Sequence, residues 1–220
     1  WCIFIGATSQ YLFGALPPSQ LQKMLQNPDV ITSGVFADSG TAMFEERDGQ
    51  AGYVINGHWR WGSGCRNARW ISGGIHEVDA SGENVTDVPR LTRVFFQPNE
   101  IELVDNWHVS GMRGSGSSDY IADDVWVPAE RMAGDVEDTE HASQPIYHFP
   151  KFALLGIPIG AICLGMARAC LEEVIRASKE KTPQGSRRAL SLRPSLHIDV
   201  AEADAALNAA RAYFYQTIDN

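Results

Sequence analysis

The strongest structural signal in the sequence is the stretch Tyr53-Val-Ile-Asn-Gly-His-Trp-Arg-Trp-Gly-Ser-Gly-Cys65. Its Asn56-Gly57 pair stands between two runs that are rich in aromatic and β-branched residues. Asn-Gly is a strong signal for a type I′ hairpin turn, because both central residues of that turn need positive φ. We therefore expect Tyr53 to Ile55 to pair with His58 to Trp61 as two strands of a hairpin.

The same stretch carries the chemistry that a binding site would need. Side chains alternate between the two faces of a strand, so Trp59, Trp61 and, if the strand continues, Ser63 are expected on one face. Gly62 and Gly64 flank the serine without side chains, which would let a flat ligand approach the backbone. The face therefore suits a planar aromatic cofactor. Alternatively, the two Trp side chains fill a β core and the glycines form a bulge.

Composition excludes some classes of function. The chain has 220 residues, 44% of them hydrophobic, which is enough for a real core. A formal net charge of -9 and a pI near 5.1 argue against a nucleic-acid partner and against an anionic membrane surface. The four Cys include no C-x-x-C pair and the six His show no zinc-type spacing, so we expect no metal site. Reduced thiols and the lack of a signal peptide favour a cytoplasmic protein.

Short β-rich runs broken by Gly, Asp and Asn fill the middle of the chain, between apolar helical patterns at residues 1–15 and after residue 147. Seven short strands predict a small sandwich or barrel. A polar stretch, 79–90, is expected to be an exposed hairpin loop. The predicted strands are Ile31 to Ala37, Thr41 to Arg47, Tyr53 to Trp61, Trp70 to Val78, Thr92 to Gln97, Glu102 to His108 and Tyr120 to Val127.

Tyr147 to Lys181 is predicted to be one long helix, with Pro194 to Ile218 as its antiparallel neighbour. The first half of the long helix, Phe152 to Met166, is almost entirely apolar. A membrane span is not expected, because this run is shorter than about 20 residues and is interrupted by glycine and proline. A helix that is apolar on every side is expected inside a helical bundle or at a subunit interface. Trp1 at the start and a helical pattern that stops at Asn220 without a cap indicate a fragment.

The glycine-rich stretch Gly111-Met-Arg-Gly-Ser-Gly-Ser-Ser-Asp119 has no Gly-Lys-Ser/Thr ending and leads into a strand, which argues against Walker and Rossmann loops. Trp107, this stretch, Asp124-Val-Trp-Val-Pro128 and Arg131 occur in an order that resembles the acyl-CoA dehydrogenase superfamily, as does the Trp-Gly-Ser hairpin. The later motifs are similar to the branch of two-component flavin monooxygenases. They are Tyr147-His-Phe-Pro150, Gly165-Met-Ala-Arg168 and Lys181-Thr-Pro-Gln-Gly-Ser-Arg-Arg188.

The resemblance spans essentially the whole chain and implies an α+β multidomain fold of the acyl-CoA dehydrogenase type. Residues 1–29 would end an N-terminal helical domain, and 30–134 would form a central β-barrel or sandwich. Residues 135–146 would be a linker, and 147–220 would be the first two helices of a C-terminal four-helix bundle. The resemblance also implies a homotetramer.

A flavin site is the second implication of the resemblance. Ser63 would hydrogen-bond flavin N5, Trp61 would lie against the isoalloxazine ring, and Gly62 and Gly64 would border the ring. The preceding strand, with Phe36 and Ala37, would also contact the flavin, but Ala37 stands where dehydrogenases carry a flavin-bonding Thr.

The connector that begins at Lys181 also departs from the dehydrogenase pattern. It reads Lys-Thr-Pro-Gln-Gly, where dehydrogenases carry Arg-x-Gln-Phe-Gly to hold the adenylate half of FAD. The loss of the Phe and of the bidentate Arg favours FMN or an exchangeable reduced flavin over tightly held FAD.

The predicted function is a flavin-dependent monooxygenase that uses O2 and reduced flavin from a separate reductase to hydroxylate or oxidise a small aromatic or heterocyclic substrate. The alternatives are an FAD-dependent acyl-CoA dehydrogenase and a non-catalytic tetrameric relative. Such an enzyme needs a dry pocket, which Trp59, Trp61 and Phe36 would supply. The acid or base is expected beyond this chain, and His108 is a candidate only by its place beside Trp107.

Overall fold

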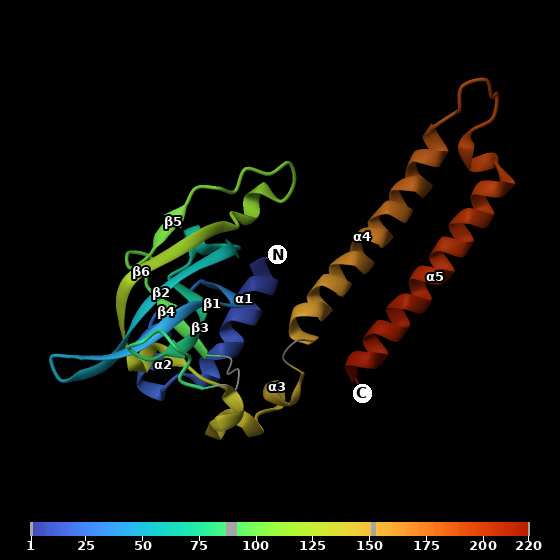
Figure 1. Cartoon of the computed structure of the whole chain (residues 1–220). Helices are drawn as coiled ribbons and strands as arrows, with labels where there is room; N and C mark the ends of the chain where they lie inside the picture. Colours follow the sequence, from blue (N-terminus) through green and yellow to red (C-terminus); the bar gives the residue numbers. More distant parts are fainter. Residues whose placement is uncertain (1, 87–91, 151–152, 220) are drawn as a thin grey trace. The chain divides into compact units, whose positions relative to one another are not determined.

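The structure is a computed structural model that describes residues 2–86, 92–150 and 153–219 (Figure 1). Its contacts divide the chain into two compact units, Trp1–Lys151 and Phe152–Asn220. The first unit contains the strands with the N-terminal helices, and the second contains a pair of long helices.

Within the described residues, one seven-stranded mixed sheet forms the body of the first unit, in the order β5-β6-β2-β1-β3-β4-β7. β1 pairs in parallel with β3, and all the other neighbours are antiparallel. This sheet and the helices confirm the α+β class. The strands are β1 Thr32–Arg47, β2 Gln50–Gly62, β3 Trp70–Val78, β4 Thr92–Phe96, β5 Glu102–Val104, β6 Ser118–Pro128 and β7 Met132–Ala133.

The first two predicted strands form a single strand, β1, with irregular register against β3 between Val35 and Gly40. A bulge keeps the chain extended while it bends, so the polar residues in the middle do not end the strand. Of the exposed loop predicted at 79–90, residues 79–86 lie between β3 and β4 and are largely exposed. Residues 87–90 lie outside the described residues.

The predicted hairpin turn at Asn56-Gly57 is wrong. The chain turns instead at Asp48-Gly49, where φ is 51° and 77°, and β1 pairs with β2 on either side of it. Asn56 and Gly57 lie inside β2, opposite Thr41 and Gly40. Asp-Gly is as good a type I′ sequence as Asn-Gly, so the local signal did not discriminate between two candidate turns eight residues apart.

Gly57 is needed inside β2 because of the indole of Trp59. A Cβ built on Gly57 would lie 2.6 Å from Trp59, which is closer than real atoms approach. The neighbouring Asn56 side chain is used at an irregularity between β2 and β6: its amide donates to Asp124 Oδ1 at 2.9 Å and its oxygen accepts from the Asp124 N–H at 2.8 Å. Gly57 therefore makes room for a core side chain, and Asn56 supports the pairing of β2 with β6.

The sheet curls around Trp59, which is fully buried. Trp59 stacks on Tyr120 of β6 at 5.2 Å and donates from Nε1 to Gly74 O of β3 at 2.8 Å. Tyr120 in turn donates to Ser72 O of β3 at 2.6 Å. Since strands lie about 4.8 Å apart, a flat sheet would hold β6 and β3 about 14 Å from each other. The hydrogen bond from Tyr120 to β3 therefore requires the strong curvature that is visible in Figure 1.

A second cluster of buried side chains joins the sheet to α1 (Cys2–Tyr11) and α2 (Pro18–Met24). The apolar pattern at 1–15 continues after α1 as a 3-10 turn, Leu12–Ala15. The prediction that 1–29 ends a separate helical domain and that 135–146 is a linker remains a prediction. The residues of this cluster are Leu12, Phe13, Leu16, Met24, Val30, Trp70, Phe95 and Ala133.

The single helix predicted over 147–181 is interrupted. α3 (Pro145–His148) ends before Phe149-Pro150, and α4 begins at Ala153 and ends at Glu180. Proline disfavours a helical conformation in the residue before it, which explains why the helix breaks there.

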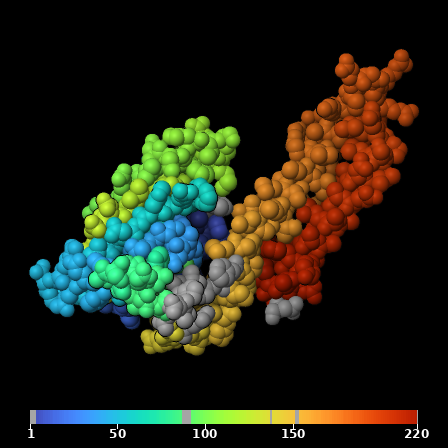
Figure 2. Space-filling view, viewed as in Figure 1, coloured from blue at the N-terminus to red at the C-terminus, as the bar shows by residue number. Residues whose placement is uncertain are grey.

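The second unit is an antiparallel helix pair, α4 (Ala153–Glu180) and α5 (Pro194–Asp219), packed along its length (Figure 2). Arg168 of α4 bonds Asp204 at 2.6 Å and Asn208 at 2.9 Å on α5. By length and composition alone, α4 is apolar enough to cross a membrane. Large apolar side chains of α4 are exposed in this unit, namely Ile159, Ile162, Met166, Val174 and Ile175.

Candidate functional site

The end of β2 does not follow the expected alternation. Trp59 is fully buried, whereas the Trp61 side chain is 70% exposed. Trp61 has a φ of 64°, so its backbone is left-handed and the two-residue period of an extended strand is lost there. The expectation that Trp59, Trp61 and Ser63 share one face is therefore wrong. Trp59 fills the β core, and Trp61 presents an indole to solvent.

Asp119 holds the unusual backbone of Trp61. Its Oδ1 accepts from the Trp61 N–H at 3.2 Å, and its Oδ2 lies 2.9 Å from His58 Nε2. Burial alone would raise the pKa of Asp119, but the hydrogen bonds from Trp61, His58 and Asn106 lower it below the usual value. Asp119 is therefore a carboxylate, and it fixes a backbone conformation that costs a non-glycine residue about 1–2 kcal/mol.

Ser63, which is 5% exposed, begins a row of hydroxyl groups. Its Oγ lies 2.7 Å from Ser117 Oγ, which lies 2.7 Å from Ser115 Oγ. Ser115 donates to Met112 O at 2.8 Å. The backbone oxygen of Ser63 accepts from Ser33 Oγ at 2.6 Å. The hydroxyl of Ser63 thus belongs to a continuous polar chain that enters the loop before β6.

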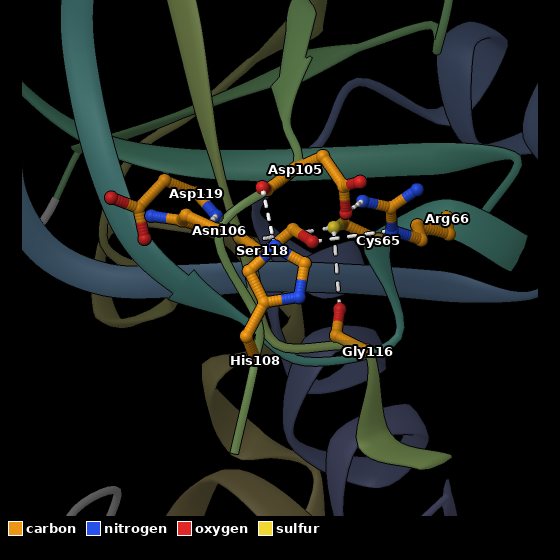
Figure 3. A network of polar contacts seen from close by, with 8 residues as sticks. All are labelled: Cys65, Arg66, Asp105, Asn106, His108, Gly116, Ser118 and Asp119. Atoms are coloured by element: carbon orange, nitrogen blue, oxygen red, sulfur yellow. Dashed lines mark hydrogen bonds and ion pairs between the residues drawn. The ribbon is translucent and has the colours of Figure 1, made fainter. Parts of the chain in front are cut away.

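Polar contacts fasten the loop between β5 and β6 to the turn that follows β2 (Figure 3). Arg66 donates to Ser118 Oγ at 3.2 Å and to Asp105 Oδ1 at 2.6 Å. Cys65 is a buried free thiol, and its Sγ lies 3.8 Å from the Gly116 and Ser118 carbonyl oxygens. Burial raises the pKa of the Cys65 thiol, so it is a packing group and not a nucleophile.

His108 is used within this loop. Its Nε2 donates to Asp105 O at 3.1 Å (Figure 3), and the residue is exposed. In this structure the His108 ring therefore stabilises the loop by bonding the Asp105 carbonyl. Among the residues that the structure describes, no cluster of three or more His, Cys, Asp or Glu is arranged to hold a metal ion.

The arrangement fits a planar ligand with a hydrogen-bonding edge. An exposed indole and a serine hydroxyl stand two residues apart, separated only by Gly62. Gly64 has a φ of 80°, and open space lies where a Cβ would be. A flat ring can therefore approach the backbone here without meeting a side chain. An isoalloxazine ring, with N5 on one edge, has this shape and chemistry.

Comparisons with known proteins show which fold this is. Residues 157–220 match the model of the acyl-CoA dehydrogenase C-terminal domain. XiaF from Streptomyces sp., solved in complex with FADH2 and glycerol, superposes with a TM-score of 0.82 at 22% identity, covering 98% of this chain and 55% of that one. The fold is that of the acyl-CoA dehydrogenase superfamily.

Two curated relatives match almost the whole chain. Indole-3-acetate monooxygenase from Acinetobacter baumannii is 29% identical over 100% of this chain and 54% of its own length. The oxygenase component of FADH(2)-dependent resorcinol hydroxylase from Rhizobium sp. is 29% identical over 96% of this chain and 53% of its own. These matches confirm the resemblance to the flavin monooxygenase branch. The chain spans about half the length of the curated relatives it matches.

The other predicted site residues, Phe36, Ala37 and Lys181, have no described contact with the turn at Trp61 to Gly64. Phe36 is half-buried with the Arg93 guanidinium 5.2 Å from its ring centre, and Ala37 is exposed on β1. Lys181 is exposed in the connector between α4 and α5, which belongs to the second unit. The structure therefore brings together Trp61, Gly62, Ser63 and Gly64, and the roles of Phe36, Ala37 and Lys181 remain predictions.

Sequence reasoning missed Ser115, Ser117 and Asp119 as parts of the site. All three lie in the glycine-rich stretch whose composition stood out, but that stretch is more than 50 residues away from Ser63 along the chain. The hydrogen bond between Ser63 and Ser117 depends on the pairing of β2 with β6. Local pattern alone carries no information on that pairing.

Proposed function

We propose that the protein is the oxygenase component of a flavin-dependent monooxygenase. It would take reduced flavin from a separate reductase and use O2 to hydroxylate or oxidise a small aromatic or heterocyclic molecule. The observation that carries the proposal is the exposed Trp61 indole beside the buried Ser63 hydroxyl. The relatives named as monooxygenases support the reaction class. We also propose a cytoplasmic location, because the cysteine pattern is the one expected of reduced thiols.

Each residue of the turn has a distinct part in this proposal. Trp61 covers one face of the ring, and Gly64 leaves the backbone open to it, whereas Gly62 is buried against Tyr120 and does not border the ring as expected. Ser63 hydrogen-bonds N5, and its surroundings keep water away from that edge. The reduced flavin itself supplies the electrons that activate O2. The protein therefore positions and encloses the cofactor.

A dehydrogenase is the competing function, and the connector at Lys181 distinguishes the two. It lacks the Phe and the Arg that would hold the adenylate half of FAD in acyl-CoA dehydrogenases. A non-catalytic scaffold, the third candidate, has no need for an exposed indole on a strained backbone beside an oriented hydroxyl. Both observations favour a site that exchanges reduced flavin.

Flavin binding tests the proposal directly. The protein at its full natural length is expected to purify largely colourless and to bind reduced FMN more tightly than FAD. The physical reason is that Lys181 stands where dehydrogenases carry the bidentate Arg for the adenylate half of FAD, and that the Phe of that motif is missing. Anaerobic calorimetric titration with each reduced flavin measures both affinities. A yellow protein that keeps stoichiometric FAD through gel filtration would support the dehydrogenase instead.

We also propose that the protein assembles as a homotetramer, because α4 exposes apolar side chains along its length. Contiguous apolar surface of several hundred Å² is rare on monomers. Sedimentation of the full-length protein should give a single tetrameric species. Ile162→Glu on the exposed apolar side of α4 should shift it to smaller species, whereas the exposed Glu172→Gln on the same helix should not. A monodisperse monomer of the unaltered protein would reject the tetramer.

A further inference from the structure

The row of hydroxyl groups that starts at Ser63 has a fixed direction. Met112 O is a carbonyl and only accepts, so the Ser115 hydroxyl must donate to it. A hydroxyl has one proton, and therefore Ser115 can only accept from Ser117. By the same argument Ser117 accepts from Ser63. One carbonyl thus orients three protons in series, from Ser63 towards Met112.

Burial protects the part of the row that lies nearest the proposed ligand, while the bond from Ser115 to Met112 O is exposed. Ser63 is 5% exposed and Ser117 is 4% exposed, so water does not readily replace either partner. Ser33 bonds the backbone oxygen of Ser63 and leaves the Oγ lone pairs free. Ser63 Oγ therefore uses its proton in the hydrogen bond to Ser117, and towards a ligand it can act only as an acceptor.

A hydrogen-bond acceptor at this place discriminates between the two redox states of a flavin. Reduced flavin carries a hydrogen on N5 and can donate it, whereas oxidised flavin offers only a lone pair at N5. Oxidised flavin would need a donor, and Ser63 would have to break its bond to Ser117 to provide one. The orientation of the hydroxyl row therefore matches the reduced cofactor.

We propose that Ser115 and Ser117 are positioning residues that keep Ser63 an acceptor, and that they thereby give the site its preference for reduced over oxidised flavin. This inference rests on the proposed flavin function. Neither serine contacts the cofactor in this proposal, and both act through the proton of Ser63. The preference would let spent, oxidised flavin leave and reduced flavin take its place.

The ratio of dissociation constants for oxidised and reduced FMN tests the proposal. Titration calorimetry with oxidised FMN, and anaerobically with dithionite-reduced FMN, should show tighter binding of reduced FMN. Ser117→Ala removes the group to which Ser63 donates, and Ser115→Ala removes the group that orients Ser117. In either variant the Ser63 hydroxyl is free to donate to oxidised flavin. The ratio should fall about 2- to 12-fold, the range that one hydrogen bond supplies. A tenfold fall makes the midpoint potential of the bound flavin more negative by about 30 mV.

Two further variants separate orientation from general damage. Ser117→Thr keeps a hydroxyl and should keep the ratio of the unaltered protein. Ser72→Ala removes another buried serine hydroxyl, one that bonds Ser33 O and lies outside the row, and should also leave the ratio unchanged.

The outcomes separate this inference from the proposed function. If the unaltered protein prefers reduced FMN but the ratio is the same in Ser115→Ala and Ser117→Ala, the positioning role is wrong and the flavin function stands. If the unaltered protein binds neither form of FMN or FAD, the flavin function fails and the inference fails with it.

Discussion

Trp59→Ala is expected to remove about 3–5 kcal/mol from the free energy of unfolding of the first unit. The Trp59 indole is fully buried and stacks on Tyr120. Around it the backbone approaches at Gly40, Gly57 and Gly73, each of which lies too close to the ring for a Cβ. Because glycines have no side chains that could move into the vacated volume, the cavity stays open and the cost lies at the upper end of the range.

Thermal and urea unfolding, followed by circular dichroism, would measure this loss. A loss of this size is a large part of the 5–15 kcal/mol that stabilises a typical domain, so much of the variant should be unfolded or insoluble. Trp61→Ala is the matched control, because its indole is 70% exposed, and its unfolding free energy should change by no more than about 0.5 kcal/mol. Equal destabilisation by the two substitutions would contradict the assignment of Trp59 to the core and of Trp61 to the surface.

Ser63→Ala is expected to weaken the binding of reduced FMN by about 0.5–1.5 kcal/mol, which is the contribution of one hydrogen bond. The fold should persist, since Ser63 donates to Ser117 and its removal leaves no buried donor without a partner. The larger effect is kinetic. Without the contact at N5, more of the reducing equivalents should appear as hydrogen peroxide and less as hydroxylated product.

Coupling is measured as product formed per NADH consumed, with the reductase supplying reduced flavin and a phenol or indole as the trial substrate. Ser72→Ala, which alters a buried serine outside the hydroxyl row, should couple as the unaltered protein does. If Ser63→Ala retains both full coupling and unaltered flavin affinity, then the Ser63 hydroxyl serves the structure only and the site lies elsewhere.

The sequence by itself determined the class of the fold and the position of most elements. The β-rich runs at Trp70 to Val78 and Tyr120 to Val127 lie in β3 and β6, and the helical pattern from Pro194 is α5. These signals are local: β-branched and aromatic runs, apolar periodicity and proline positions act within a few residues. The ordered motifs also gave the superfamily, because several short patterns in a fixed order are specific where each one alone is not.

The tertiary structure decided which of two equivalent local signals is used. Asp48-Gly49 and Asn56-Gly57 both suit a tight turn. Gly57 packs against the Trp59 ring whereas Gly49 has open space around it, and this difference exists only in the curled sheet. The left-handed backbone of Trp61 likewise depends on Asp119, which lies 58 residues later in the chain. Such contacts follow from strand register, which is set by burial and pairing over the whole sheet and not by the sequence around each residue.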